Sequence, residues 1–195
     1  MSPVKFVQSS GGLLLVFGGF LLIISGIGQL LLNTSLVWAF PWTVYALVVG
    51  MCLVTLGLFR LFNLLNPRLN LFGRIALLAS LIGAAVASFG WALSLIAPDS
   101  FFGLLMAGWM LHLMGVSVFG GYAVTTHLLP RWNFALLIGS AFPLVILFAF
   151  PGFSTGGINW SSAAVLLLIG FGWALTGLAL ERKSDAAQTL TAQHG

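Results

Sequence analysis

Uninterrupted apolar runs, each long enough to cross the hydrocarbon of a bilayer, recur along the whole chain. Only 5% of the 195 residues are charged, whereas a soluble domain carries roughly 25%, so too few polar groups exist to cover a surface that faces water. In lipid, backbone N–H and C=O groups must be paired within the protein, which leaves helices or closed barrels. Barrel strands alternate apolar and polar residues, and these runs do not. The sequence therefore predicts an all-α membrane protein.

Prolines and short polar segments divide the apolar runs into six predicted transmembrane helices. The predicted spans are 11–32, 42–59, 75–97, 101–126, 133–150 and 161–180. We expect residues 1–183 to form a single six-helix transmembrane domain and residues 184–195 to form a short polar cytoplasmic tail. The first run is too long for the apolar region of a signal peptide, and no clear cleavage site follows it. We therefore expect it to be a permanent span.

The basic residues predict how these helices are oriented. All seven fall on one side of the six predicted spans, at Lys5, Arg60, Arg68, Arg74, Arg131, Arg182 and Lys183. Basic loops stay in the cytoplasm, so both termini are predicted to be cytoplasmic. The basic residues are scattered, so the net charge of +4 does not indicate binding to nucleic acid. The expected partners are membrane lipid and other membrane protein subunits. The single cysteine, Cys52, excludes an internal disulfide.

Stripes of small residues follow two of the predicted helices. In membranes, helices associate where small residues let the backbones approach, and a repeat of 3.5 residues is typical of a left-handed seam. One stripe lies in the first span, at Gly12, Gly19 and Gly26, and the other in the third, at Ala76, Ser80, Gly83, Ala87 and Gly90. The stripes either hold the bundle together or dock another protein, and general packing favours the first. Val16 is expected to face lipid.

A short internal repeat links the third and sixth spans. Phe-Gly-Trp-Ala-Leu-Ser at 89–94 resembles Phe-Gly-Trp-Ala-Leu-Thr at 171–176, and the two spans run in opposite directions. A three-plus-three inverted repeat, which is common in transporters, would place them so. The remaining spans do not align at this offset, so coincidence is the competing explanation.

His112 is the candidate cofactor-binding residue, because it is a polar residue near the middle of the fourth span. Gly108 and Gly115 share its helix face, and small neighbours could admit a flat macrocycle such as haem or chlorophyll with an axial histidine ligand. The competing hypothesis is a neutral histidine that hydrogen-bonds to a neighbouring helix. His127 lies near the inner interface, so ligation of one haem by both histidines is excluded.

Sulfur-containing side chains suggest a second cofactor. Met106, Met110 and Met114 are four residues apart in the fourth span, and Met51 and Cys52 lie at similar depth in the second. Thioether and thiolate ligands suit copper(I). The competing hypothesis is that the methionines fill a helix face, and no recognised copper motif is present. The sequence therefore assigns no metal site.

The predicted spans contain no Asp, Glu, Lys or Arg, which argues against an ion-coupled pump. Pro143 is expected to kink the fifth span by removing a backbone hydrogen bond. No nucleophile–base pair, phosphate-binding loop, zinc spacing or nucleotide fingerprint is evident, and the predicted loops are short. We therefore expect no enzymatic activity.

The segment that joins the fourth and fifth spans carries a resemblance. His-Leu-Leu-Pro-Arg-Trp at 127–132, followed by the apolar residues 133–139, resembles a segment common in uncharacterised bacterial multi-span proteins, in which a Leu-Pro-Arg-Trp turn precedes an apolar helix with a glycine. The resemblance covers about 20 residues. It implies a bacterial inner-membrane protein and carries no activity and no site residues.

Three functional hypotheses follow from these patterns. The leading one is a non-enzymatic membrane subunit or accessory protein that packs against other membrane proteins, lipid or pigment. The second is a small transporter or channel for an uncharged or apolar solute, based on Pro143, the glycine-rich spans and the short repeat. The third is a redox or pigment subunit that uses His112.

Overall fold

The computed structural model describes residues 3–32, 40–94, 96–97, 100–128, 134–150, 154–155 and 158–193. Its long helices are α1 (Pro3–Leu32), α2 (Phe40–Leu65), α3 (Leu71–Ser94), α4 (Phe102–Thr125) and α7 (Trp160–Gln193). By length and composition, all five are apolar enough to cross a membrane, which confirms the prediction of a helical multi-span membrane protein. The predicted breaks at 33–35 and 98–99 and the turn at 129–132 lie outside the described residues.

The shorter elements connect these helices. The 3-10 helix η2 (Asn66–Arg68) follows α2, and α5 (Phe134–Ile138) and α6 (Ala141–Ala149) occupy the fifth predicted span. The strands β1 (Ser154–Thr155) and β2 (Ile158–Asn159) pair antiparallel between α6 and α7, so the described part of the chain is helical apart from this hairpin and short turns.

Several helices extend beyond their predicted limits. Arg60 lies inside α2 and Arg74 inside the first turns of α3, so most of the polar stretch at 60–74 is helix and not loop. Helix α7 continues through most of the segment predicted as a tail, to Gln193. Polar residues mark where a helix leaves the hydrocarbon of the bilayer, but the backbone hydrogen bonds of the helix do not have to stop there. The helix continues into the membrane–water interface, where arginine side chains can reach water.

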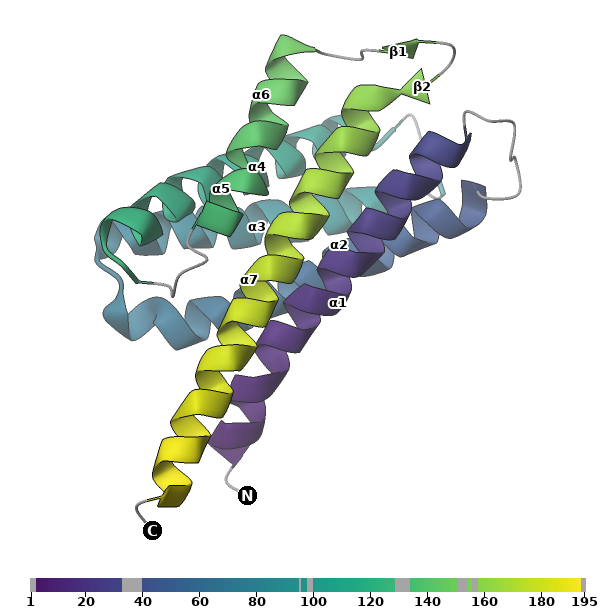
Figure 1. The fold of residues 1–195 in the computed structure, drawn as a ribbon. Coiled ribbons are helices and arrows are strands. Elements are labelled where there is room, and N and C mark those ends of the chain that lie inside the picture. Colours follow the sequence, from purple (N-terminus) through teal and green to yellow (C-terminus); the bar gives the residue numbers. More distant parts are fainter. Residues whose placement is uncertain are drawn as a thin grey trace.

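The helices form a ring around one hydrophobic core (Figure 1). Helix α1 packs between α2 and α7, α3 packs between α2 and α4, and α5 and α6 lie between α4 and α7. The start of α1 and the end of α7 lie together at one end of the molecule. Helices α5 and α6 run from the end where α4 finishes to the end where α7 begins.

The glycine stripe of α1 packs directly on α7. A Cβ atom added at Gly19 would lie 2.5 Å from the carbonyl oxygen of Gly170, and one added at Gly12 would lie 2.8 Å from that of Gly177. Gly26 also faces α7. A side chain at Gly12 or Gly19 would overlap the neighbouring backbone, so the absence of side chains there is what lets the two helices touch.

The stripe of α3 packs in the same way on α4. A Cβ atom at Gly108 would lie 2.8 Å from the Cα of Ala87, and one at Gly115 would lie 2.5 Å from the backbone nitrogen of Ser80. Gly90 belongs to the same face of α3 and contacts Leu105. Both stripes are therefore buried between helices of the described chain.

Val16 corrects one expectation about α1. Its side chain is only 8% exposed, and its Cγ2 atom would lie 2.7 Å from a Cβ atom added at Gly177. The expectation that Val16 faces lipid is wrong, because it lies one helical turn after Gly12 and shares its face. The exposed positions of this helix include Phe17 and Phe20, at 60% and 52%.

The repeated hexamer does not occupy equivalent places in the two helices. In a three-plus-three repeat, α3 would correspond to α7 and α4 to α1. Gly90 of the first hexamer contacts Leu105 of α4, so Gly172 should contact α1. It contacts Gly139 of the chain between α5 and α6 instead. The hexamer therefore gives no support to an inverted repeat, and the structure favours coincidence.

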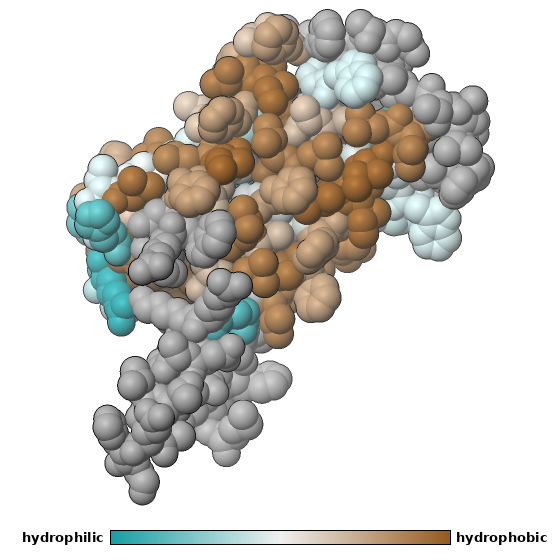
Figure 2. All heavy atoms as spheres, viewed as in Figure 1, coloured by the Kyte–Doolittle hydropathy of each residue, from teal (hydrophilic) through white to brown (hydrophobic). Residues whose placement is uncertain are grey.

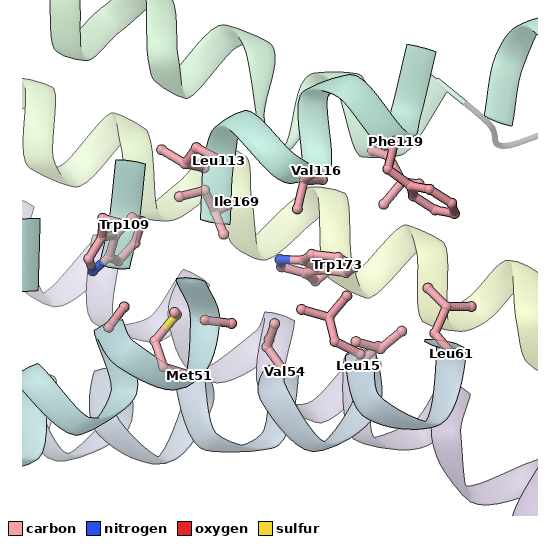
Figure 3. Close-up of a cluster of buried hydrophobic side chains, with 14 of the residues drawn as sticks. Leu15, Met51, Val54, Leu61, Trp109, Leu113, Val116, Phe119, Ile169 and Trp173 are labelled. Atoms are coloured by element: carbon pink, nitrogen blue, oxygen red, sulfur yellow. The ribbon is translucent and has the colours of Figure 1, made fainter. Parts of the chain in front are cut away.

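Large apolar side chains fill the centre of the ring. Trp173 lies in the middle of the cluster, with Val116 on one side and Leu15 and Val54 on the other (Figure 3). The face shown in Figure 2 is covered by apolar side chains, with polar side chains at the edges. An apolar exterior around an apolar core is what a bundle solvated by lipid requires.

Candidate functional site

The candidate site is built around His112, halfway along α4, whose side chain is completely buried. Gly83 of α3 makes its position possible. A Cβ atom at Gly83 would collide with the backbone nitrogen of His112 and would lie 2.7 Å from its Cα. Because Gly83 has no side chain, α3 approaches α4 closely enough for Ser80, one turn earlier, to reach the imidazole.

Ser80 makes two contacts with the same ring nitrogen. The Nδ1 atom of His112 lies 3.1 Å from the backbone carbonyl oxygen of Ser80 and 3.2 Å from its Oγ. Both distances are within the normal range for hydrogen bonds. This interaction matches the hypothesis of a histidine that bonds to a neighbouring helix.

The other ring nitrogen, Nε2, makes no such hydrogen bond in the described part of the chain. Nε2 of His112 is buried and has no hydrogen-bond partner among the described residues. The ring lies against the indole of Trp173, with ring centroids 5.7 Å apart and planes tilted by 32°. Buried polar atoms without partners are uncommon in folded proteins and require an explanation.

The contact between Ser80 and His112 brings a hydroxyl to a histidine, a pairing that the sequence pattern did not reveal. A general base needs a lone pair on the nitrogen that faces the hydroxyl. The carbonyl oxygen offers only lone pairs, so its 3.1 Å contact is a hydrogen bond only when Nδ1 carries a proton, and in that tautomer the pair is not a nucleophile and its base. Both side chains are also fully buried.

The glycines beside His112 do not provide space for a macrocycle. Gly108 and Gly115 face the backbone of α3 at Ala87 and Ser80, and a single added carbon atom would already overlap it. The space that the haem or pigment hypothesis needs is therefore filled by the neighbouring helix. Gly108 and Gly115 therefore do not provide the opening that this hypothesis assigned to them.

The sulfur-containing residues also point in different directions. Met51 is fully buried in the core, whereas its neighbour Cys52 is exposed on the outside of α2. Met114 is 57% exposed, and Met106 is partly buried against the core. The structure does not bring these side chains together as one ligand set.

An interruption of the helix between α5 and α6 lies next to this site. The fifth predicted span is divided into α5 and α6 at residues 139–140. Pro143 was expected to kink this helix, but the helix is interrupted four residues earlier, at Gly139. The reason is that the ring of Pro143 would clash with the carbonyl group of Gly139 in a continuous helix. Ser140 is fully buried there, and its Oγ donates to the carbonyl oxygen of Leu136 at 2.6 Å.

Helix α7 connects the break to His112. A Cβ atom added at Gly172 would lie 2.5 Å from the Cα of Gly139, so the two backbones touch. The next residue of α7, Trp173, lies against the ring of His112. Thr176 is buried one turn after Gly172 and donates to its carbonyl oxygen at 2.7 Å. Buried polar side chains of α3, α4, α7 and the α5–α6 connection thus lie inside an otherwise apolar core.

Two further polar contacts escaped the sequence analysis. Thr55 of α2 and Ser88 of α3 place their hydroxyl oxygens 3.1 Å apart. Glu181, which follows the last predicted span, belongs to α7, and its Oε1 accepts from the backbone N–H of Leu13 at 3.1 Å. The lack of a side chain at Gly12 admits this carboxylate to the backbone of α1.

Comparison of the chain with protein families, curated proteins and solved structures gives no match.

Proposed function

We propose that this chain is a six-span bacterial inner-membrane protein with both ends in the cytoplasm, and that it is a non-enzymatic carrier for a small uncharged solute. The solute binds in the buried polar layer around His112. One observation carries the proposal: the interruption between α5 and α6 lies against Gly172, and the adjacent Trp173 covers a histidine whose Nε2 has no partner in the described protein.

Discontinuous helices support the assignment of this layer as a binding site. Membrane transporters place substrates near the middle of the bilayer, where broken helices present backbone groups that a continuous helix would keep for itself. A histidine inside the membrane is costly and marks a functional site by default. The break contacts Gly172 and the histidine ring lies against Trp173, the next residue, so both features contact the same turn of α7.

The charges support an uncharged solute. Within the described residues, Arg60 and Glu181 lie toward the ends of the apolar spans of α2 and α7, and the buried polar side chains named above are His112 and the hydroxyls of Ser80, Ser140 and Thr176. A charged solute at this depth would require an opposite charge beside it.

The six spans and the cytoplasmic ends are supported by the course of α5 and α6. This segment returns from the end of the bundle where α4 finishes to the end where α7 begins. With that return, Lys5, the arginines at 60, 68 and 74, and the basic residues at 182–183 fall on one side. Such a distribution is typical of cytoplasmic loops.

A flux assay tests the carrier. Purified protein is reconstituted into liposomes, and swelling is followed by light scattering after addition of glycerol, urea or acetamide. We expect at least one of these solutes to enter faster than in protein-free liposomes. His112→Leu should remove the excess rate, whereas Phe20→Leu, at an exposed position of α1, should retain it. Equal rates with and without protein for every solute would contradict the proposal.

One argument for an accessory subunit no longer applies, because both small-residue stripes pack against other helices of the same chain. The short predicted loops and the apolar exterior remain compatible with it. Native mass spectrometry after mild detergent extraction distinguishes the two proposals. A stoichiometric partner chain would favour the subunit, and recovery of the chain with lipid alone would favour the carrier.

A further inference from the structure

We infer that the Nε2 atom of His112 is a hydrogen-bond acceptor for a neutral O–H or N–H donor, such as water, an alcohol or a primary amide. This inference deepens the proposed function by naming the class of ligand, and it rests on that function only where the ligand is the transported solute. The assignment of the acceptor itself rests on the contacts of the imidazole with α3 and α7.

The first step is the position of the imidazole proton. Nδ1 lies 3.1 Å from the carbonyl oxygen of Ser80, which can only accept. If Nδ1 carried a lone pair, two lone pairs would face each other in the low dielectric of the core, where mismatched polar groups are most costly. The proton therefore lies on Nδ1, and the Oγ of Ser80, at 3.2 Å, can share it as a second acceptor.

The second step concerns the other nitrogen. A neutral imidazole with its proton on Nδ1 presents a lone pair at Nε2. This atom is buried and has no hydrogen-bond partner in the described part of the chain. The two contacts with Ser80 hold one edge of the ring, and the indole of Trp173 lies 5.7 Å from its centroid, so the direction of the Nε2 lone pair is fixed.

The third step is the class of ligand. A fixed lone pair attracts a donor and repels a group that has only acceptors, such as an ester, an ether or a tertiary amide. The buried hydroxyls of Ser140 and Thr176 already donate, to the carbonyl oxygens of Leu136 and Gly172 respectively. The remaining donor must come from a bound molecule, and water, alcohols and primary amides share the required group.

The position of the proton can be measured in the full-length protein in lipid nanodiscs with ¹⁵N-labelled histidine. The spectrum of His112→Gln identifies the signals of His112 by their loss, while those of His127 and His194 remain. We expect protonated Nδ1 and unprotonated Nε2. Ser80→Ala should leave this tautomer unchanged, because the backbone carbonyl remains. A proton on Nε2 in the wild-type protein would overturn the inference without any reference to a variant.

Two matched probes then test the acceptor. Acetamide has N–H donors, and N,N-dimethylacetamide has the same carbonyl group without them. We expect acetamide to shift the Nε2 signal and dimethylacetamide to leave it in place. If Nε2 instead responds only to exchange of H₂O for D₂O, an internal water is the donor and the acceptor site stands. An Nε2 signal that responds to none of these probes overturns it.

The outcomes separate this inference from the proposed function. A shift with acetamide and no solute flux would leave the acceptor site in place and remove the carrier. Solute flux that depends on His112, together with a proton on Nε2, would retain the carrier and remove the acceptor.

Discussion

At the residue scale, His127, two residues after the end of α4, has a backbone conformation that is uncommon outside glycine. Its φ is 51°, in the left-handed region. The N–H of Leu128 donates to the carbonyl oxygen of Ala123 at 3.1 Å, and the N–H of His127 donates to the carbonyl oxygen of Val124 at 3.4 Å. This is the arrangement in which glycine usually follows the last helical residue.

Glycine at this position should therefore stabilise the protein. The side chain of His127 is exposed, so His127→Gly loses little packing, while it relieves a left-handed conformation that costs a non-glycine residue roughly 1–2 kcal/mol. We expect the free energy of unfolding to rise by about 1 kcal/mol, measured by thermal or denaturant unfolding in detergent. His127→Ala serves as the control and should bring no such gain. Equal effects of the two variants would show that the backbone is not strained there.

His112→Gln tests the site with little loss of stability. Glutamine keeps a donor and an acceptor, and interhelical hydrogen bonds in membranes average about 0.6 kcal/mol. We expect a folded variant with a similar unfolding temperature and reduced solute flux. A large loss of stability with unchanged flux per folded molecule would instead assign His112 a purely structural role.

Sequence reasoning located one half of this site and missed the other. His112 was identifiable because a histidine near the middle of an apolar span is unusual. Ser80 was recognised only as a member of a packing stripe, because the close approach at Gly83 that brings its carbonyl group to the imidazole is a tertiary contact. The lack of a partner at Nε2 could not be predicted either, since it depends on every neighbouring helix at once.

At the element scale, the contact between α3 and α4 offers a matched pair of glycines within one helix. A Cβ atom at Gly115 would lie 2.5 Å from the backbone nitrogen of Ser80, whereas one at Gly121 would meet nothing within 4 Å. The sequence predicted the two stripes but not which helices they contact, because a stripe specifies a face and not its partner. Val16 was expected to face lipid for the same reason: the sequence did not show that α7 packs against its face of α1.

Alanine at these two positions should have opposite effects. Gly115→Ala forces the helices apart and should destabilise the protein by about 1–3 kcal/mol, the usual range for overpacking. Gly121→Ala adds a better helix former in open space and should be neutral or stabilising by up to about 1 kcal/mol. Unfolding temperatures of the purified variants measure both. A similar loss in both variants would show that glycine matters in α4 for a reason other than helix contact.

The break between α5 and α6 shows a similar limit. Pro143 correctly indicated an irregular fifth helix, but sequence placed a kink at the proline and the structure places an interruption at residues 139–140. Part of the reason is local, because the proline ring interferes with the carbonyl group four residues earlier. The rest is the approach of Gly139 to Gly172, two positions 33 residues apart in the chain (172 minus 139), which no local pattern contains.

At the scale of the whole molecule, the side of the membrane on which each end lies is the most direct test of the architecture. We expect a reporter inserted near Asn66, or fused after Lys183, to be cytoplasmic and one inserted near Gly156 to be exterior. The reason is that positively charged loops are retained in the cytoplasm. Paired fusions that report from opposite compartments measure this. A cytoplasmic signal at Gly156 would contradict the six-span proposal.

The pairing of α1 with α7 also has a consequence for how the protein is made. Gly12 and Gly19 lie against residues of α7, among them Gly177 and Gly170, which are synthesised at least 151 residues later (170 minus 19). Until α7 enters the bilayer, the glycine face of α1 in the nascent chain is exposed, because the helix that packs on it has not yet been translated. Polypeptides truncated before Trp160 should therefore be recognised by membrane quality control and degraded faster than the full-length chain. Supplying α7 as a separate peptide should slow their degradation.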